Sequence, residues 1–162
     1  SEEEALNFLF EGEINRTVSA HALNKDSSRS HCIYTVYLES KSRAESTEKV
    51  VFSKIHFVDL AGCERTKKSG AMGVNLREAT YINKSLSFLE QVVISVCDEK
   101  RDHIPYRQSK LTNLLKNSIG GNCETIMITN IWPESEHLEE TISSLKFATR
   151  MMKVKNEPVI NI

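Results

Sequence analysis

Two short segments rich in β-branched and aromatic residues, 32–39 and 50–58, constrain most strongly what this chain can fold into. Both have the composition typical of β-strands, and the second ends on apolar residues, which predicts that this end is buried. The stretch between them, from Lys41 to Glu48, is polar and predicts a loop. We therefore expect the two strands to pair as an antiparallel hairpin.

The N-terminal segment predicts a short helix before this hairpin. Ser1 and Glu4 stand at the spacing of a capping box, apolar residues then mark one helical face, and Gly12 is the expected stop. A polar stretch follows from about Asn15 to His31.

Apolar periodicity predicts three further helices after the hairpin. Residues 61–79 are rich in Gly, Ser and charge, and we expect mostly loop. A helix of about 18 residues then begins with Thr80 as its N-cap, because apolar residues follow at spacings of four, three, four and three. The next helix is expected to stop at Gly120, and the last to run from a cap at Ser135 to Pro158.

A third strand is expected late in the chain. Residues 125–131 are mostly apolar and β-branched, and they read as a buried strand. Strands mixed with helices of this length predict an α/β layered fold.

Composition excludes several classes of protein. Of 162 residues, 40% are hydrophobic and 27% are charged, which is typical of a soluble globular domain. The 21 basic and 22 acidic residues give a net charge of −1, which argues against a uniformly basic nucleic-acid binder. We expect no membrane span, because no apolar run approaches the roughly 20 residues that a membrane helix needs. The acidic N-terminus is unlike a signal peptide, and the four cysteines lack zinc-site spacing, which indicates reduced thiols.

The polar segment 24–31 precedes the first predicted strand and reads Asn-Lys-Asp-Ser-Ser-Arg-Ser-His. Clustered hydroxyls can ligate Mg²⁺ and contact phosphate, and an arginine can pair with a carboxylate. Serine-rich loops are also common turn-formers, so this segment alone favours a simple turn.

The segment 59–64, Asp-Leu-Ala-Gly-Cys-Glu, follows the end of the second predicted strand. A nucleoside triphosphatase needs an aspartate there to hold Mg²⁺, and a glycine three residues later whose N–H can approach the γ-phosphate. A strand-terminal aspartate is often only a cap, so D-x-x-G alone is a weak signal.

Together the two segments resemble the C-terminal half of a kinesin motor domain. N-x-x-S-S-R-S-H matches the switch I of that family at 24–31, and D-L-A-G-x-E matches its switch II at 59–64. Further landmarks follow in the family's order: Y-I-N-K-S-L at 81–86, H-I-P-Y-R-Q-S-K-L-T at 103–112, S-I-G-G-N at 118–122 and S-L-K-F-A at 144–148. The segments 81–91 and 101–105 look most like the kinesin-9 branch.

This resemblance implies a fold and a division of the chain. The fold is α/β, part of the three-layer α/β/α arrangement of kinesin P-loop NTPases, in which helices flank a central, mostly parallel sheet. Residues 1–155 would form the C-terminal half of a motor domain, and 156–162 the start of the neck linker. The relay helix is expected at about 80–98, and the microtubule-facing loop and helix at about 103–119.

The resemblance also implies a nucleotide and metal site for ATP or ADP with Mg²⁺. Ser28 would ligate Mg²⁺, and Asp59 would hold it through water. Ser27 would approach the γ-phosphate or the attacking water, and the Gly62 N–H would sense the γ-phosphate. These roles suit phosphoryl transfer, in which positioning and charge stabilisation supply most of the catalysis.

The catalytic pair implied by the resemblance is Arg29 with Glu64. Their salt bridge would close switch I onto switch II, position the lytic water and relay its proton, while Asn24 would support the loop and the water. Cys63 stands where the family usually has serine, and a thiol is a weaker hydrogen-bond donor than a hydroxyl.

A basic segment predicts the partner surface. Residues 65–116 carry a net charge of +5, which leaves −6 on the rest of the chain. Such a surface steers towards an acidic partner, and in kinesins this region faces tubulin. The contact candidates are Arg65, Lys68, Lys84, Arg107 and Lys110. The alternative is a solvated charged face without a partner.

The phosphate-binding pattern G-x-x-x-x-G-K-S/T is absent from this chain. In kinesins that loop precedes switch I, and its strand lies between the strand ending at Asp59 and the one at 125–131. We therefore expect the chain to need the N-terminal half of its motor domain. Alone it should be inactive, expose apolar strand edges, and be unstable, aggregate or pair differently.

The function implied is that of a microtubule-stimulated ATPase motor on cytoplasmic microtubules, with the kinesin-9 likeness pointing to the axoneme of a cilium or flagellum. One alternative is a non-catalytic microtubule-binding module derived from a kinesin. The intact residues at 24–31 and 59–64 argue against lost chemistry. Another is a relative of myosin or the small GTPases, which the segments 81–86 and 103–112 disfavour.

Overall fold

The computed structural model divides the chain into two compact units. The structure describes residues 1–23, 30–43, 49–62 and 74–162. The first unit comprises Ser1–Gly62, Met72–Ile82 and Ile160–Ile162, and the second comprises Cys63–Ala71 and Asn83–Val159.

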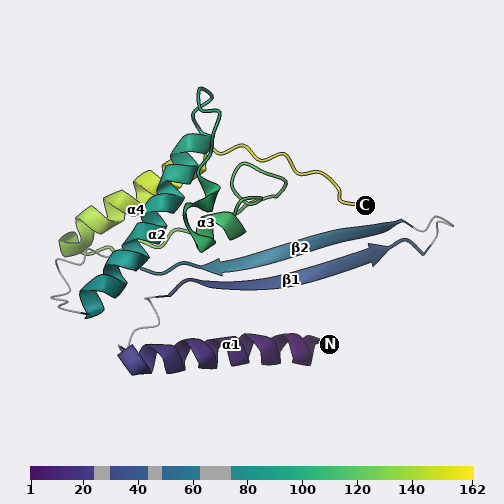
Figure 1. The fold of residues 1–162 in the computed structure, drawn as a ribbon, viewed down its shortest axis with the longest axis horizontal. Coiled ribbons are helices and arrows are strands. Elements are labelled where there is room, and N and C mark those ends of the chain that lie inside the picture. The colour runs from purple at the N-terminus through teal and green to yellow at the C-terminus, as the bar shows by residue number, and fades with distance from the viewer. Residues whose placement is uncertain (24–29, 44–48, 63–73) are drawn as a thin grey trace. The chain divides into compact units, whose positions relative to one another are not determined.

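The sheet of the first unit is the hairpin of β1 (Cys32–Lys41) and β2 (Val50–Asp59), whose strands lie side by side in Figure 1. They pair antiparallel, with Cys32 opposite Asp59 at one end and Lys41 opposite Val50 at the other. The predicted hairpin is confirmed, and each strand is slightly longer than expected. Opposed side chains link the strands: the Thr35 hydroxyl lies 2.8 Å from the His56 Nδ1.

Helix α1 (Glu2–Leu23) runs along this hairpin in Figure 1. The Ser1 Oγ accepts the Glu4 N–H at 3.3 Å, as the capping box predicted, and the Tyr34 hydroxyl donates to the Ala5 carbonyl at 2.8 Å. The predicted stop at Gly12 is wrong, because the helix continues through the polar stretch to Leu23. An interior glycine costs a helix about 1 kcal/mol, which tertiary contacts further along the helix can offset.

Helix α2 (Val74–Val96) begins six residues before the predicted cap at Thr80. From Asn83 onwards its residues belong to the second unit, and they supply much of that unit's core. Leu89 and Val93 are buried as the periodicity predicted, and Val92 is fully buried beside them. Among the described residues of this unit, the other buried apolar side chains are those of Leu111, Leu115 and Ile119.

Two short helical segments continue the second unit: the 3-10 turn η2 (Tyr106–Gln108) and helix α3 (Lys110–Leu114). Ser109 caps α3 in a capping box with Thr112. Turns carry the chain on to Gly120, whose φ of +78° is the only positive φ among the described residues. The predicted helix end at Gly120 is wrong, because α3 ends at Leu114 and turns occupy residues 115–120. Gly120 itself adopts the left-handed conformation that favours glycine.

Residues 125–131 form no strand, contrary to the prediction. Ile126 and Ile128 are 86% and 83% exposed. A strand needs a neighbour to receive its backbone hydrogen bonds, and no described strand pairs with this segment. An apolar, β-branched composition alone therefore does not establish a strand here.

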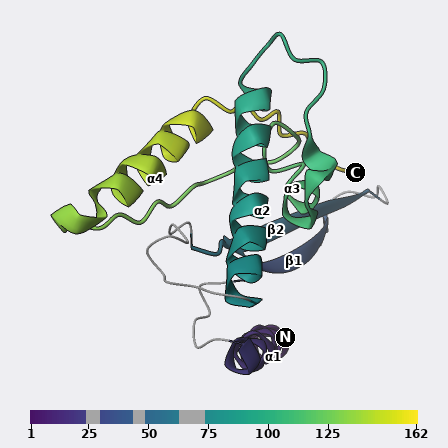
Figure 2. The same cartoon turned by 60° about the vertical axis from the view of Figure 1, so that its left-hand side comes forward.

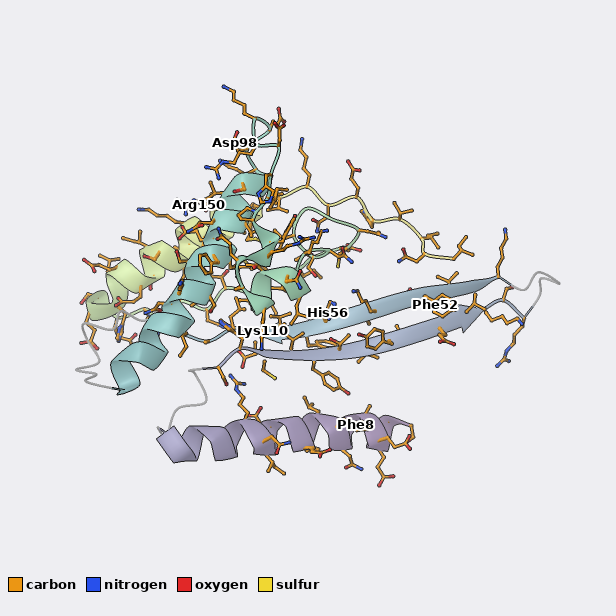
Figure 3. The ribbon with its side chains drawn as sticks, in the orientation of Figure 1. Phe8, Phe52, His56, Asp98, Lys110 and Arg150 are labelled. Carbon is orange, nitrogen blue, oxygen red and sulfur yellow. The ribbon has the colours of Figure 1, made fainter. Side chains whose placement is uncertain are left out.

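The chain ends with the 3-10 turn η3 (Ser135–His137) and helix α4 (Leu138–Met151). Ser135 is not a cap, because Glu134 holds that position and makes no side-chain cap hydrogen bond, and α4 ends well before Pro158. Figure 2 shows α4 and α2 as separate helices. Arg150, labelled in Figure 3, joins them through an ion pair with Glu90.

The described residues contain no helix long and apolar enough to cross a membrane. Cys32, Cys97 and Cys123 carry free thiols.

Candidate functional site

The hairpin register brings together the segments that flank the two predicted switches. Because Cys32 pairs with Asp59, the residues just before β1 lie beside those just after β2. Ser30 and His31 come from the end of segment 24–31, and Asp59 begins segment 59–64. The described part of the candidate site is this junction.

Arg16, on α1, ties the two sides of the junction together. Its Nη1 donates to the Asp59 Oδ2 at 2.8 Å, its Nε to the Ser30 Oγ at 3.1 Å and its Nη2 to the Ser30 carbonyl at 2.9 Å. The Arg16 side chain is only 12% exposed, whereas that of Asp59 is 69% exposed. The fork geometry of a guanidinium suits this arrangement, in which one cation holds a carboxylate and a backbone carbonyl.

His31 makes a second link across the junction. Its Nδ1 accepts the Ala61 backbone N–H at 3.1 Å, and Ala61 is 4% exposed. Burial lowers the pKa of His31, the nearby Arg16 lowers it further, and Asp59 acts in the opposite direction. The neutral imidazole is thus favoured, which leaves one ring nitrogen as a hydrogen-bond acceptor.

Sequence reasoning missed Arg16 altogether and gave His31 no role beyond the motif. Arg16 lies in a polar stretch, and nothing in its neighbours marks it as a partner of Asp59. His31 is the last residue of the motif at 24–31. Its position one residue before a predicted strand was the available signal.

Most of the predicted chemical residues lie outside the described part of the chain. These are Asn24, Ser27, Ser28 and Arg29 of switch I, and Glu64, Arg65 and Lys68 after β2. Asp59 and Gly62 are described and lie at the end of β2, three residues apart. The structure therefore describes two of the residues predicted for switch II, Asp59 and Gly62, and the roles of these residues and of the Arg29–Glu64 pair stay predictions.

The donor types at this junction fit Mg²⁺, which prefers oxygen ligands and keeps several waters. Asp59 offers a largely exposed carboxylate that Arg16 holds in place. The serines of segment 24–31 would offer hydroxyls. Among the described residues, no cluster of three or more His, Cys, Asp or Glu side chains could hold a metal ion. A site with one water-mediated carboxylate does not need such a cluster.

Three of the predicted partner-binding cations are described, and all belong to the second unit. Lys84 is exposed on α2, with its Nζ 5.6 Å from the centre of the Phe88 ring. Arg107 lies in η2 and Lys110 begins α3, and both are exposed. Their charges are available to solvent, as a contact surface requires.

The segment predicted to begin the neck linker is held by backbone and amide contacts. Within the second unit, the Asn156 Oδ1 accepts the Gly120 N–H at 2.7 Å, and the Glu157 N–H donates to the Gly121 carbonyl at 3.1 Å. Within the first unit, the Phe52 N–H donates to the Asn161 carbonyl at 3.1 Å. Sequence reasoning did not anticipate Asn156 as an anchor.

Comparison with known families identifies the chain. The profile of the kinesin motor domain matches residues 1–154. The chain belongs to the kinesin motor domain family. The predicted resemblance is thereby confirmed.

Curated relatives place this kinesin chain near the kinesin-9 branch, as predicted. It is 61% identical over 160 residues to the kinesin-like protein KIF9 of Homo sapiens, which covers 99% of the chain and 20% of that protein. It is 48% identical over 161 residues to the kinesin-like protein KLP1 of Chlamydomonas reinhardtii, covering 99% of the chain and 21% of the relative. The chain thus spans about a fifth of the length of these relatives.

Solved kinesin structures share the fold. One, a KIF14 dimer in a two-heads-bound state with AMP-PNP in complex with a microtubule, matches with a TM-score of 0.87 and 37% identity. Another, a fast kinesin, matches with a TM-score of 0.87 and 40% identity. Each match covers 99% of this kinesin chain and just under half of the solved chain, 46% and 45% respectively. The predicted class, a partial α/β kinesin fold, is confirmed, although the described sheet is only the antiparallel hairpin.

Proposed function

We propose that this chain is the switch-bearing and track-facing part of a microtubule motor that hydrolyses ATP. The observation that carries this proposal is that Arg16 contacts both Ser30 and Asp59. Ser30 lies at the end of switch I, and Asp59 lies at the start of switch II. Family membership supports the class of function, and the geometry supports a junction through which the two switches are coupled. Residues 1–155 act as the C-terminal half of the motor domain, and 156–162 begin the neck linker.

The nucleotide-facing roles fall on both sides of the junction. Ser28 and Asp59 hold Mg²⁺, Asp59 through water, and bound Mg²⁺ neutralises charge on the phosphates. Ser27 contacts the γ-phosphate or orients the attacking water, and the Gly62 N–H contacts the γ-phosphate. Because the chain lacks the G-x-x-x-x-G-K-S/T loop, the main grip on ATP comes from the N-terminal half of the domain.

Proton transfer is assigned to the pair of Arg29 and Glu64. Their salt bridge closes switch I onto switch II, and the pair positions the attacking water and relays its proton. Asn24 steadies the same loop. Positioning of this kind supplies much of the rate in phosphoryl transfer, where the protein forms no covalent bond.

Track binding is assigned to the basic segment 65–116. Arg65, Lys68, Lys84, Arg107 and Lys110 contact the acidic surface of tubulin. The exposure of the three described members supports this role. A matched kinesin was solved in complex with a microtubule, which supports the same partner here.

Contact of Gly62 with the γ-phosphate then shifts α2 and changes microtubule affinity.

The proposed cellular location follows from the proposed binding to microtubules. We assign the chain to microtubules of the cytoplasm and, by its similarity to kinesin-9 proteins, to the axoneme of a cilium or flagellum. The second location rests on family likeness.

The test is ATP turnover by the full-length protein with and without microtubules. Glu64→Ala should abolish most of the microtubule-stimulated turnover while ADP binding persists. Glu124→Ala, which removes an exposed acid outside both switches, is the matched control and should behave as wild type. If Glu64→Ala retained microtubule-stimulated turnover, the assignment of Glu64 to switch II would be wrong. A wild-type protein that binds microtubules without turnover would instead be a non-catalytic binding module.

A further inference from the structure

The link between His31 and Ala61 is a contact that the proposed mechanism does not use. His31 precedes β1 by one residue, and Ala61 follows the end of β2 by two. The pairing of Cys32 with Asp59 brings these two overhanging segments side by side. The contact therefore joins the end of switch I to the middle of switch II.

The chemistry of this hydrogen bond fixes the state of the ring. A backbone N–H can only donate, so the His31 Nδ1 must be the unprotonated acceptor at 3.1 Å from the Ala61 nitrogen. The Nε2 then carries the proton of the neutral imidazole. A doubly protonated ring would present two donors and could not hold Ala61 in this way.

The surroundings favour that acceptor state. Arg16 reaches the junction from α1, and its guanidinium opposes a positive charge on His31. Asp59, at the end of β2, favours a positive charge, but its carboxylate is paired with Arg16. Burial has the largest effect and lowers the pKa of His31.

We propose that His31 is a positioning residue for ATP hydrolysis, whose Nδ1 holds Ala61 so that the next amide, that of Gly62, is presented to the γ-phosphate. This proposal rests on the proposed role of Gly62. Arg16 holds Asp59 on one side of Leu60, and His31 holds Ala61 on the other. The strand end that leads to Gly62 is thus fixed at two points before nucleotide arrives.

The contact predicts that its loss lowers the rate of ATP hydrolysis without lowering the affinity for ADP or for microtubules. A misplaced Gly62 amide should weaken the contact formed with the γ-phosphate. The affinity for ADP should not change, because ADP lacks that group. Loss of one hydrogen bond of this kind corresponds to roughly a three- to tenfold change in rate. The loss should appear in kcat, while ADP affinity and microtubule affinity in ADP stay within about twofold of wild type.

The test compares two substitutions in the full-length protein. The amide oxygen of His31→Asn can replace Nδ1 as acceptor, whereas His31→Leu offers none. We expect microtubule-stimulated kcat to fall roughly three- to tenfold in His31→Leu and to recover to within about twofold of wild type in His31→Asn. His56→Asn is the matched control, since His56 also lies on the hairpin but bonds to Thr35 in the sheet, and it should leave kcat unchanged.

Equal losses in His31→Asn and His31→Leu would overturn the acceptor role and leave His31 a packing residue. So would a normal kcat in His31→Leu. Should both variants fail to fold, ¹⁵N NMR of histidine-labelled wild-type protein decides. An unprotonated His31 Nδ1 at neutral pH supports the proposal, and a protonated Nδ1 refutes it. Glu64→Ala, run in parallel, separates this outcome from a failure of the proposed function.

Discussion

Arg16 and Asp59, 43 positions apart in the sequence, are joined by an ion pair in which the arginine Nη1 lies 2.8 Å from the aspartate Oδ2. The same guanidinium donates twice to Ser30, once to its side chain and once to its backbone. One side chain of α1 therefore joins the segment just before β1 to the end of β2. The consequences of this arrangement can be measured.

Replacing Arg16 by lysine keeps the charge but removes the fork that reaches two partners at once. We expect Arg16→Lys to lower the free energy of unfolding of the complete motor domain by about 1–2 kcal/mol, because the Ser30 hydrogen bonds are lost. Denaturant titration measures this. Arg107→Lys, at an exposed position of η2, should change it by less than about 0.5 kcal/mol. Equal effects of the two substitutions would contradict the bridging role of Arg16.

Replacing Gly120 or Gly12 by alanine should change the stability of the protein in opposite directions. At Gly120 the φ is +78°, and an added Cβ would come within 2.7 Å of the Val96 Cγ1, so we expect a loss of about 1–3 kcal/mol of stability. At Gly12, inside α1, an added Cβ meets nothing within 4 Å, and the better helix propensity of alanine should add about 0.5–1 kcal/mol. Thermal unfolding of the two variants should move in opposite directions. A stabilising Gly120→Ala would show that the left-handed turn is wrong.

The stability of the hairpin should fall in mild acid. Burial and the nearby Lys54 lower the pKa of His56 below its usual value of 6.5. Between the folded and the unfolded pKa, the unfolded chain binds more protons than the folded one, so stability is full above pH 6.5 and is lost as the pH falls below it. Denaturation midpoints at pH 7.5 and pH 5.5 should therefore differ more for wild type than for His56→Gln. An equal difference would mean that His56 does not contribute.

Charge reversal at Lys110 tests the track-facing assignment. Lys110→Glu exchanges an exposed cation at the start of α3 for an anion. We expect the microtubule concentration for half-maximal ATPase to rise about tenfold at low salt and less at high salt, since salt screens exposed charges. Lys54→Glu, an exposed cation on β2 outside the basic segment, is the control. A similar rise in both variants would point to net charge rather than to a defined contact surface.

The sequence alone determined those features that depend on neighbours along the chain. The hairpin could be predicted because β-branched and aromatic residues cluster at 32–39 and 50–58. The motifs at 24–31 and 59–64 were enough to indicate the kinesin family. They also pointed to Asp59 and Gly62 as switch residues.

The tertiary structure alone decided what depends on distant partners. Helix α1 continues through Gly12 to Leu23, and its Arg16 meets Ser30 and Asp59, a contact no local pattern encodes. Residues 125–131 have a strand's composition but form none, because a strand exists only where a neighbour accepts its hydrogen bonds. His31 became a candidate positioning residue only when the register of β1 and β2 set it beside Ala61. Secondary-structure propensity depends on residues that are adjacent in the sequence. Hydrogen bonds and ion pairs between distant residues form only after the chain has folded.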